Sequence, residues 1–358
     1  MNRRFFSTLS CLLLLVLVLM VSGCSQGNNK NGDAGEKASN EMEPIVLKFA
    51  HFFPATHPVE TQLVQVWGKE VEKATNGMVK VKSYPGETLL KATETYDGVV
   101  NGVADAGLSF FSYNRGRFPM EEVIELPGIS YNNAKVVSKV GQDYIKEFNP
   151  KGIQDTKLIT VASTGPAYLA TKSPITKLEE LKGVQFRTTG LSAEAIKAIG
   201  GVPVAMPMSD AYEALSKGVV SGIISPPEAL EGYKLAEVTG NVTKTPFVYA
   251  CLFYMTMNRD VWDSLPAEAQ TAIEGVNEKF ADVAANLFDG LNAHAMKFAE
   301  ENGAKIHSLT PEETDRWVTE LEKFQQKLVD EKVKNGLPAD DAITRIKELA
   351  AKYNEMYK

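Results

Sequence analysis

Residues 178–188 read Leu-Glu-Glu-Leu-Lys-Gly-Val-Gln-Phe-Arg-Thr, a sequence that predicts a short helix leading directly into a strand. Gly183 ends the helix, and residues 184–188 place Phe186 on one face of the strand and Arg187 on the other. Arg187 also stands at the carboxyl end of the strand, where open α/β sheets bind ligands. A guanidinium is a planar fork that matches a carboxylate with two parallel hydrogen bonds. Arg187 is therefore a candidate anion-binding residue, and the alternative is a solvated arginine at a strand end.

Strands and helices alternate on both sides of this segment. The apolar pattern predicts strands over residues 45–50, 79–82, 104–111, 158–162, 184–188 and 219–224. Helices are expected from Pro58 to Gly77, through Tyr96 to about Gly102, and from Ser209 to Gly218. Two such runs in one chain predict two α/β lobes, each with helices on the faces of a sheet.

Capping signals mark further helix boundaries. Thr176 fits the N-cap of the short helix at 178–183, with Glu179 reaching back as in a capping box. A long helix is predicted from Pro266 to about Asn302, where apolar residues recur with helical spacing. Its length of about 50 Å exceeds one lobe of this size, so we expect it to brace both lobes. Another capping box at residues 310–313 begins the next helix, which stops near residues 336–338.

The N-terminus carries an export signal. Arg3 and Arg4 precede an apolar run at residues 12–20, which is shorter than the roughly 20 apolar residues that span a bilayer. Small residues then lead to Cys24 in an arrangement that resembles the bacterial lipobox. The pattern predicts a lipoprotein signal peptide over 1–23 and a lipidated Cys24 that anchors the protein to a membrane, outside the cytoplasm. A plain signal peptide with a chance cysteine is the alternative.

Residues 24–43 are polar and predict a disordered tether that reaches about 25 Å. Cys11 leaves with the signal peptide and Cys24 takes the lipid, so Cys251 has no partner for an intrachain disulfide. Cys251 lies in an apolar run, which favours a small core residue over a nucleophile. The formal net charge of −7 disfavours nucleic acid and anionic lipid as partners.

No signature of an enzyme or a cofactor site is visible. The chain lacks a nucleophile elbow, a P-loop and a zinc-protease motif. His51 and His57 flank a Phe-Phe-Pro sequence without ligand spacing, so a metal site is not expected. We therefore predict no catalytic residues, no cofactor and no metal.

Several segments in order resemble one family. Residues 178–187 are similar to the core signature of tripartite ATP-independent periplasmic (TRAP) transporter solute-binding proteins, the DctP-like family. Other similar pieces lie at residues 75–86, 102–107, 116–119, 126–128, 200–204, 212–222, 257–259 and 262–266. The resemblance extends from about Ile45 to about Tyr353.

The resemblance implies a two-lobed type II periplasmic-binding-protein fold with mixed sheets and a long helix spanning both lobes. Lobe I is expected to comprise 44–164 plus about 253–290, and lobe II 165–252 plus about 291–358. The family's binding proteins close on an organic acid and deliver it to small and large membrane subunits. Arg187 takes the place of the family's carboxylate anchor. Rival functions are a sensory co-receptor or the binding protein of an ATP-driven system; an enzyme on this fold would need a catalytic group.

Departures from the family pattern reduce the range of ligands that the site is expected to bind. Ala167 stands where sialate-binding members carry a second arginine, and Ser221 and Ser225 replace an aspartate and an asparagine. One anchoring arginine in an aromatic pocket suits a monocarboxylate with an apolar or aromatic body. The expected cleft-lining aromatic residues, about half of which should be ordinary core, are Phe52, Phe53, Phe110, Phe111, Tyr113, Tyr168, Phe247, Tyr249 and Phe253. The predicted ligand-binding residues are Arg187, Tyr168, Ser225, Phe52, Phe111, Phe247 and Tyr249.

Overall fold

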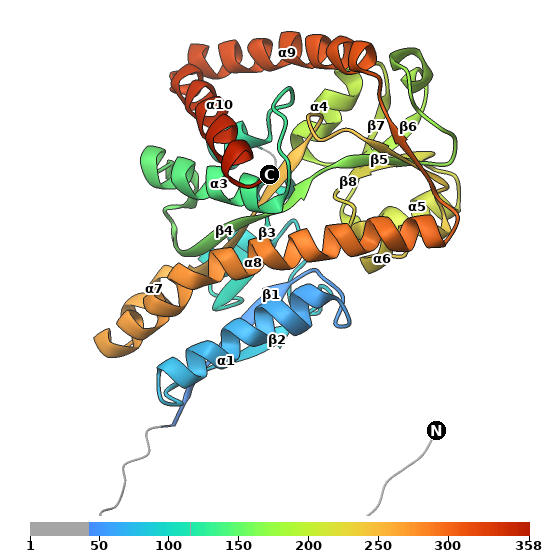
Figure 1. Ribbon diagram of the computed structural model, residues 1–358. Coiled ribbons are helices and arrows are strands. Elements are labelled where there is room, and N and C mark those ends of the chain that lie inside the picture. The colour runs from blue at the N-terminus through green and yellow to red at the C-terminus, as the bar shows by residue number, and fades with distance from the viewer. Residues whose placement is uncertain (1–42, 115) are drawn as a thin grey trace, which may run out of the picture. The chain divides into compact units, whose positions relative to one another are not determined.

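The computed structural model describes residues 43–114 and 116–358. The predicted signal peptide, the predicted lipidation site at Cys24 and all but the last residue of the predicted tether lie outside this part of the chain. The described residues form two sheets with helices packed on them (Figure 1). No helix within these residues is both long and apolar enough to cross a membrane.

The first sheet has five strands in the order β2-β1-β3-β10-β4. They are β1 (Ile45–His51), β2 (Val79–Tyr84), β3 (Ala106–Phe110), β4 (Thr156–Pro166) and β10 (Ala250–Asn258). The first three run parallel, and β10 runs antiparallel between β3 and β4, so the sheet is mixed as predicted. All nine residues of β10 are buried, which is expected for a central strand covered on both faces.

The second sheet has six strands in the order β11-β9-β5-β8-β6-β7. They are β5 (Tyr168–Thr171), β6 (Gln185–Thr188), β7 (Val202–Ala205), β8 (Gly222–Ser225), β9 (Asn241–Lys244) and β11 (Lys305–Ser308). Only Ala167 separates β4 from β5, so the chain passes from one sheet to the other at that residue. The chain returns to the first sheet between β9 and β10 and passes to the second again between β10 and β11, so three connections join the sheets.

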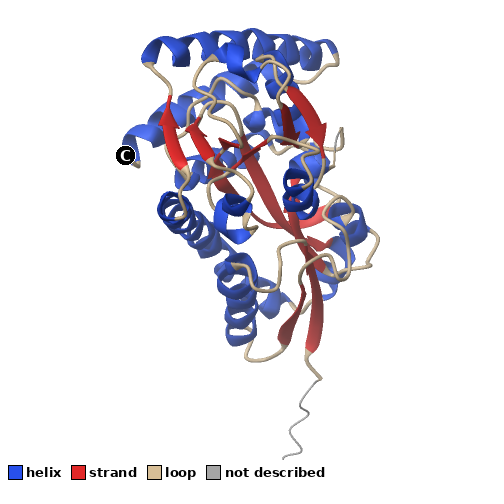
Figure 2. Cartoon of the chain, turned by 90° about the vertical axis from the view of Figure 1, so that its right-hand side faces the viewer, coloured by secondary structure: helices blue, strands red, loops and turns tan. Residues whose placement is uncertain are grey.

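Helices cover both sheets (Figure 2). The shorter ones are α1 (Gln65–Ala74), α2 (Thr95–Val100), α3 (Ala134–Phe148), α4 (Gly190–Ala198), α5 (Ala211–Ser216), α6 (Ala229–Gly232) and α7 (Arg259–Ser264). A π-helical turn, Val59–Val64, follows Pro58 and leads into α1, so this helix begins where the sequence predicts it.

The long helix α8 (Ala267–Glu301) confirms the predicted brace. It has 35 residues (Figure 1). It packs against strand β4 of the first sheet, against helix α1 beside that sheet, and against helix α6 beside the second sheet. Helices α9 (Pro311–Lys334) and α10 (Ala339–Met356) follow, with α9 against α4 and α10 against α3. The residue ranges assigned to the two lobes stay a prediction.

The capping pattern around Thr176 differs from the one expected. The turn before β6 spans Leu178–Leu181 with Lys177 as its N-cap. Glu180, rather than Glu179, accepts hydrogen bonds from the backbone of Thr176 at 2.6 Å and Lys177 at 3.1 Å. The 3-10 turn shifts the cap by one residue, and Glu179 instead pairs with Arg316. At α9 the predicted cap is present, because Glu313 N donates to Thr310 Oγ1 at 3.2 Å.

Candidate functional site

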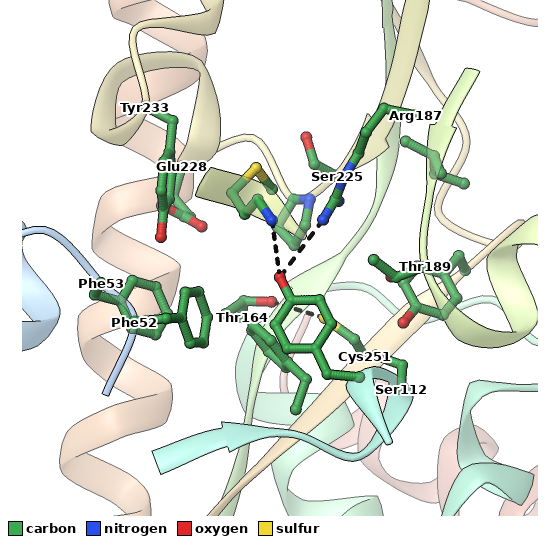
Figure 3. Close-up of a pocket in the computed structure, with 16 residues that line it drawn as sticks. Phe52, Phe53, Ser112, Thr164, Arg187, Thr189, Ser225, Glu228, Tyr233 and Cys251 are labelled. Carbon is green, nitrogen blue, oxygen red and sulfur yellow. Dashed lines mark hydrogen bonds between the residues drawn. The ribbon is translucent and has the colours of Figure 1, made fainter. Parts of the chain in front are cut away.

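A cavity with an empty volume of about 400 Å³ lies where strands of both sheets end (Figure 3). From the first sheet it is lined by residues at the carboxyl ends of β1, β3 and β4, including Phe52, Phe110 and Thr164. From the second sheet it is lined by Arg187 of β6 and Ser225 of β8. Its lining of aromatic rings with a few polar groups is typical of a site for a small organic molecule.

Arg187 lines this cavity and is only 3% exposed. Two hydrogen bonds within the protein fix the position of its guanidinium group. Its Nε donates to Met206 O at 3.0 Å, and its Nη2 donates to Tyr113 Oη at 3.5 Å. Within the described part of the chain, no carboxylate pairs with Arg187 and its Nη1 has no hydrogen-bond partner. A buried guanidinium without a counter-ion is costly, so the arrangement favours an anionic ligand.

Tyr113 completes the anion-binding end of the cavity. Its Oη accepts a hydrogen bond from Met208 N at 3.3 Å as well as the one from Arg187. Burial raises the pKa of Tyr113, so the hydroxyl keeps its proton at neutral pH. With two bonds accepted, the remaining capacity of the hydroxyl is to donate, and an anion beside Arg187 would receive it.

An aromatic wall forms the body of the cavity. Phe52 stacks on Phe53 with ring centroids 4.3 Å apart, and Phe110 lies 5.5 Å from Phe52. Tyr113 meets Phe52 edge-on at 5.4 Å, which ties the wall to the anion-binding end. These rings offer an apolar surface that suits an aromatic or aliphatic ligand body.

Cys251 also lines the cavity and behaves as an apolar group. Burial raises the pKa of its thiol to about 12, so the thiolate that a nucleophile needs is not populated at neutral pH. The sulfur shares a hydrogen bond with Thr164 Oγ1 at 3.2 Å. This agrees with the sequence-based view of Cys251 as a small buried residue.

Four of the seven predicted ligand-binding residues meet in the cavity, namely Arg187, Phe52, Ser225 and Tyr249. The other three lie elsewhere. Phe111 packs 5.0 Å from Phe118 and 5.2 Å from Tyr254 in a separate core cluster. Tyr168 borders another hollow beside α8, and Phe247 is buried with its carbonyl accepting from Gly128.

Sequence reasoning missed five polar lining residues, namely Ser112, Thr164, Thr189, Glu228 and Tyr233. Glu228 follows β8 by three residues, so the rule that strand ends carry ligand groups could have found it. Among the described residues, no cluster of three or more metal-binding side chains occurs. His51 and His57 each contact a different glutamate, Glu60 and Glu228.

Glu125 lies directly behind the cavity wall. It is 1% exposed, and Tyr249 Oη donates to it at 3.2 Å. Burial, reinforced by the nearby charge of Glu122, raises the pKa of Glu125 well above its usual value. The wall behind Tyr249 therefore contains a carboxyl group that favours the protonated form.

Replacing Glu125 with Gln is expected to stabilise the protein more at pH 8 than at pH 5. The unfolded carboxyl titrates near about 4.3, whereas the folded one holds its proton to higher pH. The stability that Glu125 contributes in acid is thus lost as pH rises toward its folded pKa. Melting temperatures of wild type and E125Q between pH 5 and 8 measure this difference.

Glu147→Gln is the matched control for this prediction. Arg345 beside Glu147 lowers the pKa of that exposed carboxyl, so its contribution is present at neutral pH and fades in acid. E147Q should therefore show no gain at pH 8. Parallel pH profiles for E125Q and wild type would contradict the assignment of Glu125.

Comparison with known proteins places this site in a family. Residues 49–332 match bacterial extracellular solute-binding protein, family 7 (DctP). The C4-dicarboxylate-binding periplasmic protein DctP of Rhodobacter capsulatus is 29% identical over 288 residues, which cover 77% of this chain and 84% of that protein.

Two solved structures have the same fold and the same identity of 29%. A marine metagenome TRAP solute-binding protein specific for aromatic acid ligands, in complex with metahydroxyphenylacetate, has a TM-score of 0.83 and covers 86% of this chain and 99% of its own. An open complex of a TRAP periplasmic solute-binding protein from Desulfovibrio salexigens has a TM-score of 0.76, with coverages of 86% and 96%. The family match spans most of the chain, and the protein belongs to the DctP family of extracellular solute-binding proteins, which are binding proteins and not enzymes.

Proposed function

We propose that this protein is the extracytoplasmic solute-binding subunit of a TRAP transporter and that it captures an organic monocarboxylate. The observation that carries the proposal is Arg187, a buried guanidinium that faces an aromatic cavity without a carboxylate partner in the described chain. The captured acid would be delivered to the small and large membrane subunits of the transporter.

The charges of the cavity favour one carboxylate over two. Arg187 is the only arginine or lysine among the described residues that line it, and Glu228 is a carboxylate that lines the side away from Arg187. A second ligand carboxylate would meet no cation and would be repelled by Glu228. The relative specific for aromatic acid ligands supports an aromatic body, whereas the equally identical Rhodobacter protein binds C4-dicarboxylates.

Contacts between the two sheets support capture by closure. Arg187 of the second sheet bonds to Tyr113 beside the first, and Glu228 bonds to His57 in the same way. A ligand that touches both sides would stabilise the closed state by its differential affinity.

A thermal-shift screen tests the monocarboxylate preference. At ligand concentrations near 100 times Kd, binding adds about 2.7 kcal/mol of stability, which raises the melting temperature of a domain this large by roughly 4 °C. We expect this shift with aromatic monocarboxylates such as benzoate and phenylacetate, and none with the uncharged benzamide. Stabilisation only by small dicarboxylates or sialate would contradict the preference.

We also propose that Cys24 carries a lipid that holds the protein on a membrane surface. One acyl-glyceryl anchor followed by a flexible tether would keep the binding domain beside the permease. Metabolic labelling with a fatty acid should mark the wild type and Cys251→Ala but not Cys24→Ala. An unlabelled wild type, or label that is still present in Cys24→Ala, would contradict the proposed lipid anchor at Cys24.

A further inference from the structure

A second polar group faces the cavity away from Arg187. Glu228 is 5% exposed, and its Oε2 lies 3.1 Å from His57 Nε2. Val59 N donates to His57 Nδ1 at 3.1 Å, so the proton of the neutral ring is on Nε2 and points at Glu228. His57 thereby satisfies one oxygen of Glu228 only, and Oε1 has no partner among the described residues.

Tyr233 adds an unused hydroxyl to the same place. Its Oη is buried and has no hydrogen-bond partner, and its ring lies 5.5 Å from that of His57. Burial, reinforced by the charge of Glu228, raises the pKa of Tyr233 well above its usual value, so the hydroxyl keeps its proton. Figure 3 shows Tyr233 and Glu228 together on the other side of the cavity from Arg187.

The backbone at Gly232 allows this pair to form. A Cβ at position 232 would lie 2.5 Å from His57 Nε2 and 3.2 Å from Glu228 Oε2. Any side chain there would push His57 away from Glu228. The glycine thus permits the close approach that orients the carboxylate, and His57 acts as a positioning residue.

The chemistry of the two unused atoms specifies their partner. Glu228 Oε1 can only accept a hydrogen bond, whereas the Tyr233 hydroxyl has a proton to donate. A ligand hydroxyl satisfies both, because it donates to Glu228 and accepts from Tyr233. An alkylammonium could pair with Glu228 but has no lone pair for Tyr233, and a carboxylate would be repelled by Glu228.

Building on the proposed function, we propose that the preferred ligand is a hydroxylated aromatic monocarboxylate. Its carboxylate binds Arg187 and Tyr113, its ring lies against the Phe52–Phe53–Phe110 wall, and its hydroxyl lies between Glu228 and Tyr233. Glu228 and Tyr233 then determine specificity, since the unsubstituted acid leaves both atoms unpaired in a buried site.

Paired titrations test this assignment. Dissociation constants are measured by calorimetry for benzoate, phenylacetate and 3-phenylpropionate and for their ring-hydroxylated isomers, with wild type, Y233F and E228Q. In the wild type, at least one hydroxylated isomer should bind about 10-fold to 100-fold more tightly than its parent acid, as expected for hydrogen bonds to a charged group. Y233F and E228Q should each lose most of that gain and should still bind the parent acids.

Tyr212→Phe is the matched control, because Tyr212 donates to Glu237 at 2.9 Å on the protein surface and should keep the full hydroxyl preference. Y233F removes a hydroxyl that has no partner, so it should fold even if E228Q does not. If no carboxylate binds the wild type, the proposed function fails. If the acids bind but no hydroxyl improves affinity, or Y233F keeps the preference, only the present inference fails.

Discussion

Replacing Arg187 with Ala is expected to abolish most of the affinity for the organic acid while leaving the fold intact. Truncating one partner of a buried, hydrogen-bonded charge pair costs about 2–5 kcal/mol, which corresponds to a roughly 30-fold to several-thousand-fold loss in binding. The side chain is 3% exposed and makes two hydrogen bonds within the protein, to Met206 and Tyr113. The remaining N–H donors of its guanidinium are available to the ligand, so the substitution lowers ligand affinity more than it lowers the stability of the fold. Calorimetry with an aromatic monocarboxylate measures the effect.

Arg187→Lys should recover only part of the affinity. A lysine ammonium is a point charge and lacks the planar fork that meets both carboxylate oxygens. It would also have to replace the hydrogen bond of Arg187 Nε to Met206 O, which fixes the guanidinium plane. Intermediate binding by R187K, between wild type and R187A, is therefore the expected order.

Arg345→Ala is the control for charge removal. Arg345 is exposed and pairs with Glu147 on the surface, so its loss changes the net charge equally without touching the cavity. Its affinity should equal that of the wild type. Unchanged affinity in a folded R187A protein, or an equal loss in R345A, would show that the carboxylate binds elsewhere.

Helix boundaries were predictable because their signals are local. Pro266 and Asn302 flank α8 as expected, and Thr310 caps α9 with its own hydroxyl. In each case the residues that set the boundary are neighbours in the chain. The strands β5, β7, β9, β10 and β11 were not predicted. For β9 and β11, four residues each give too short an alternation, and their pairing joins positions 241–244 with 305–308.

In the candidate site, the sequence also could not decide which of two adjacent residues lines the cavity. Phe110 and Phe111 are adjacent, yet Phe110 lines the cavity and Phe111 packs against Phe118. Successive side chains near a strand end face opposite ways, so composition alone could not choose between them. The pairing of His57 with Glu228 was also beyond reach, since 171 positions separate the two residues and only the assembled sheets bring them together.

Replacing Trp67 with Ala is expected to lower the free energy of unfolding by about 3–5 kcal/mol. Trp67 is fully buried, packs 5.6 Å from Phe49 and joins α1 to α8. Its indole Nε1 donates to Asn277 Oδ1 at 2.9 Å, so the truncation also leaves a buried amide oxygen without a donor. Thermal denaturation should show a fall in melting temperature of roughly 5–8 °C for a domain of this size.

Two neighbouring variants separate the causes of this loss. Trp67→Phe keeps much of the ring volume but removes the donor to Asn277, so its cost should be smaller than that of W67A. Val66→Ala alters the adjacent residue of α1, which is 36% exposed, and should stay within about 0.5 kcal/mol of the wild type. Because Trp67 does not line the cavity, folded W67A should retain wild-type ligand affinity. A W67A protein as stable as V66A would mean that α8 is held against the first sheet by other contacts.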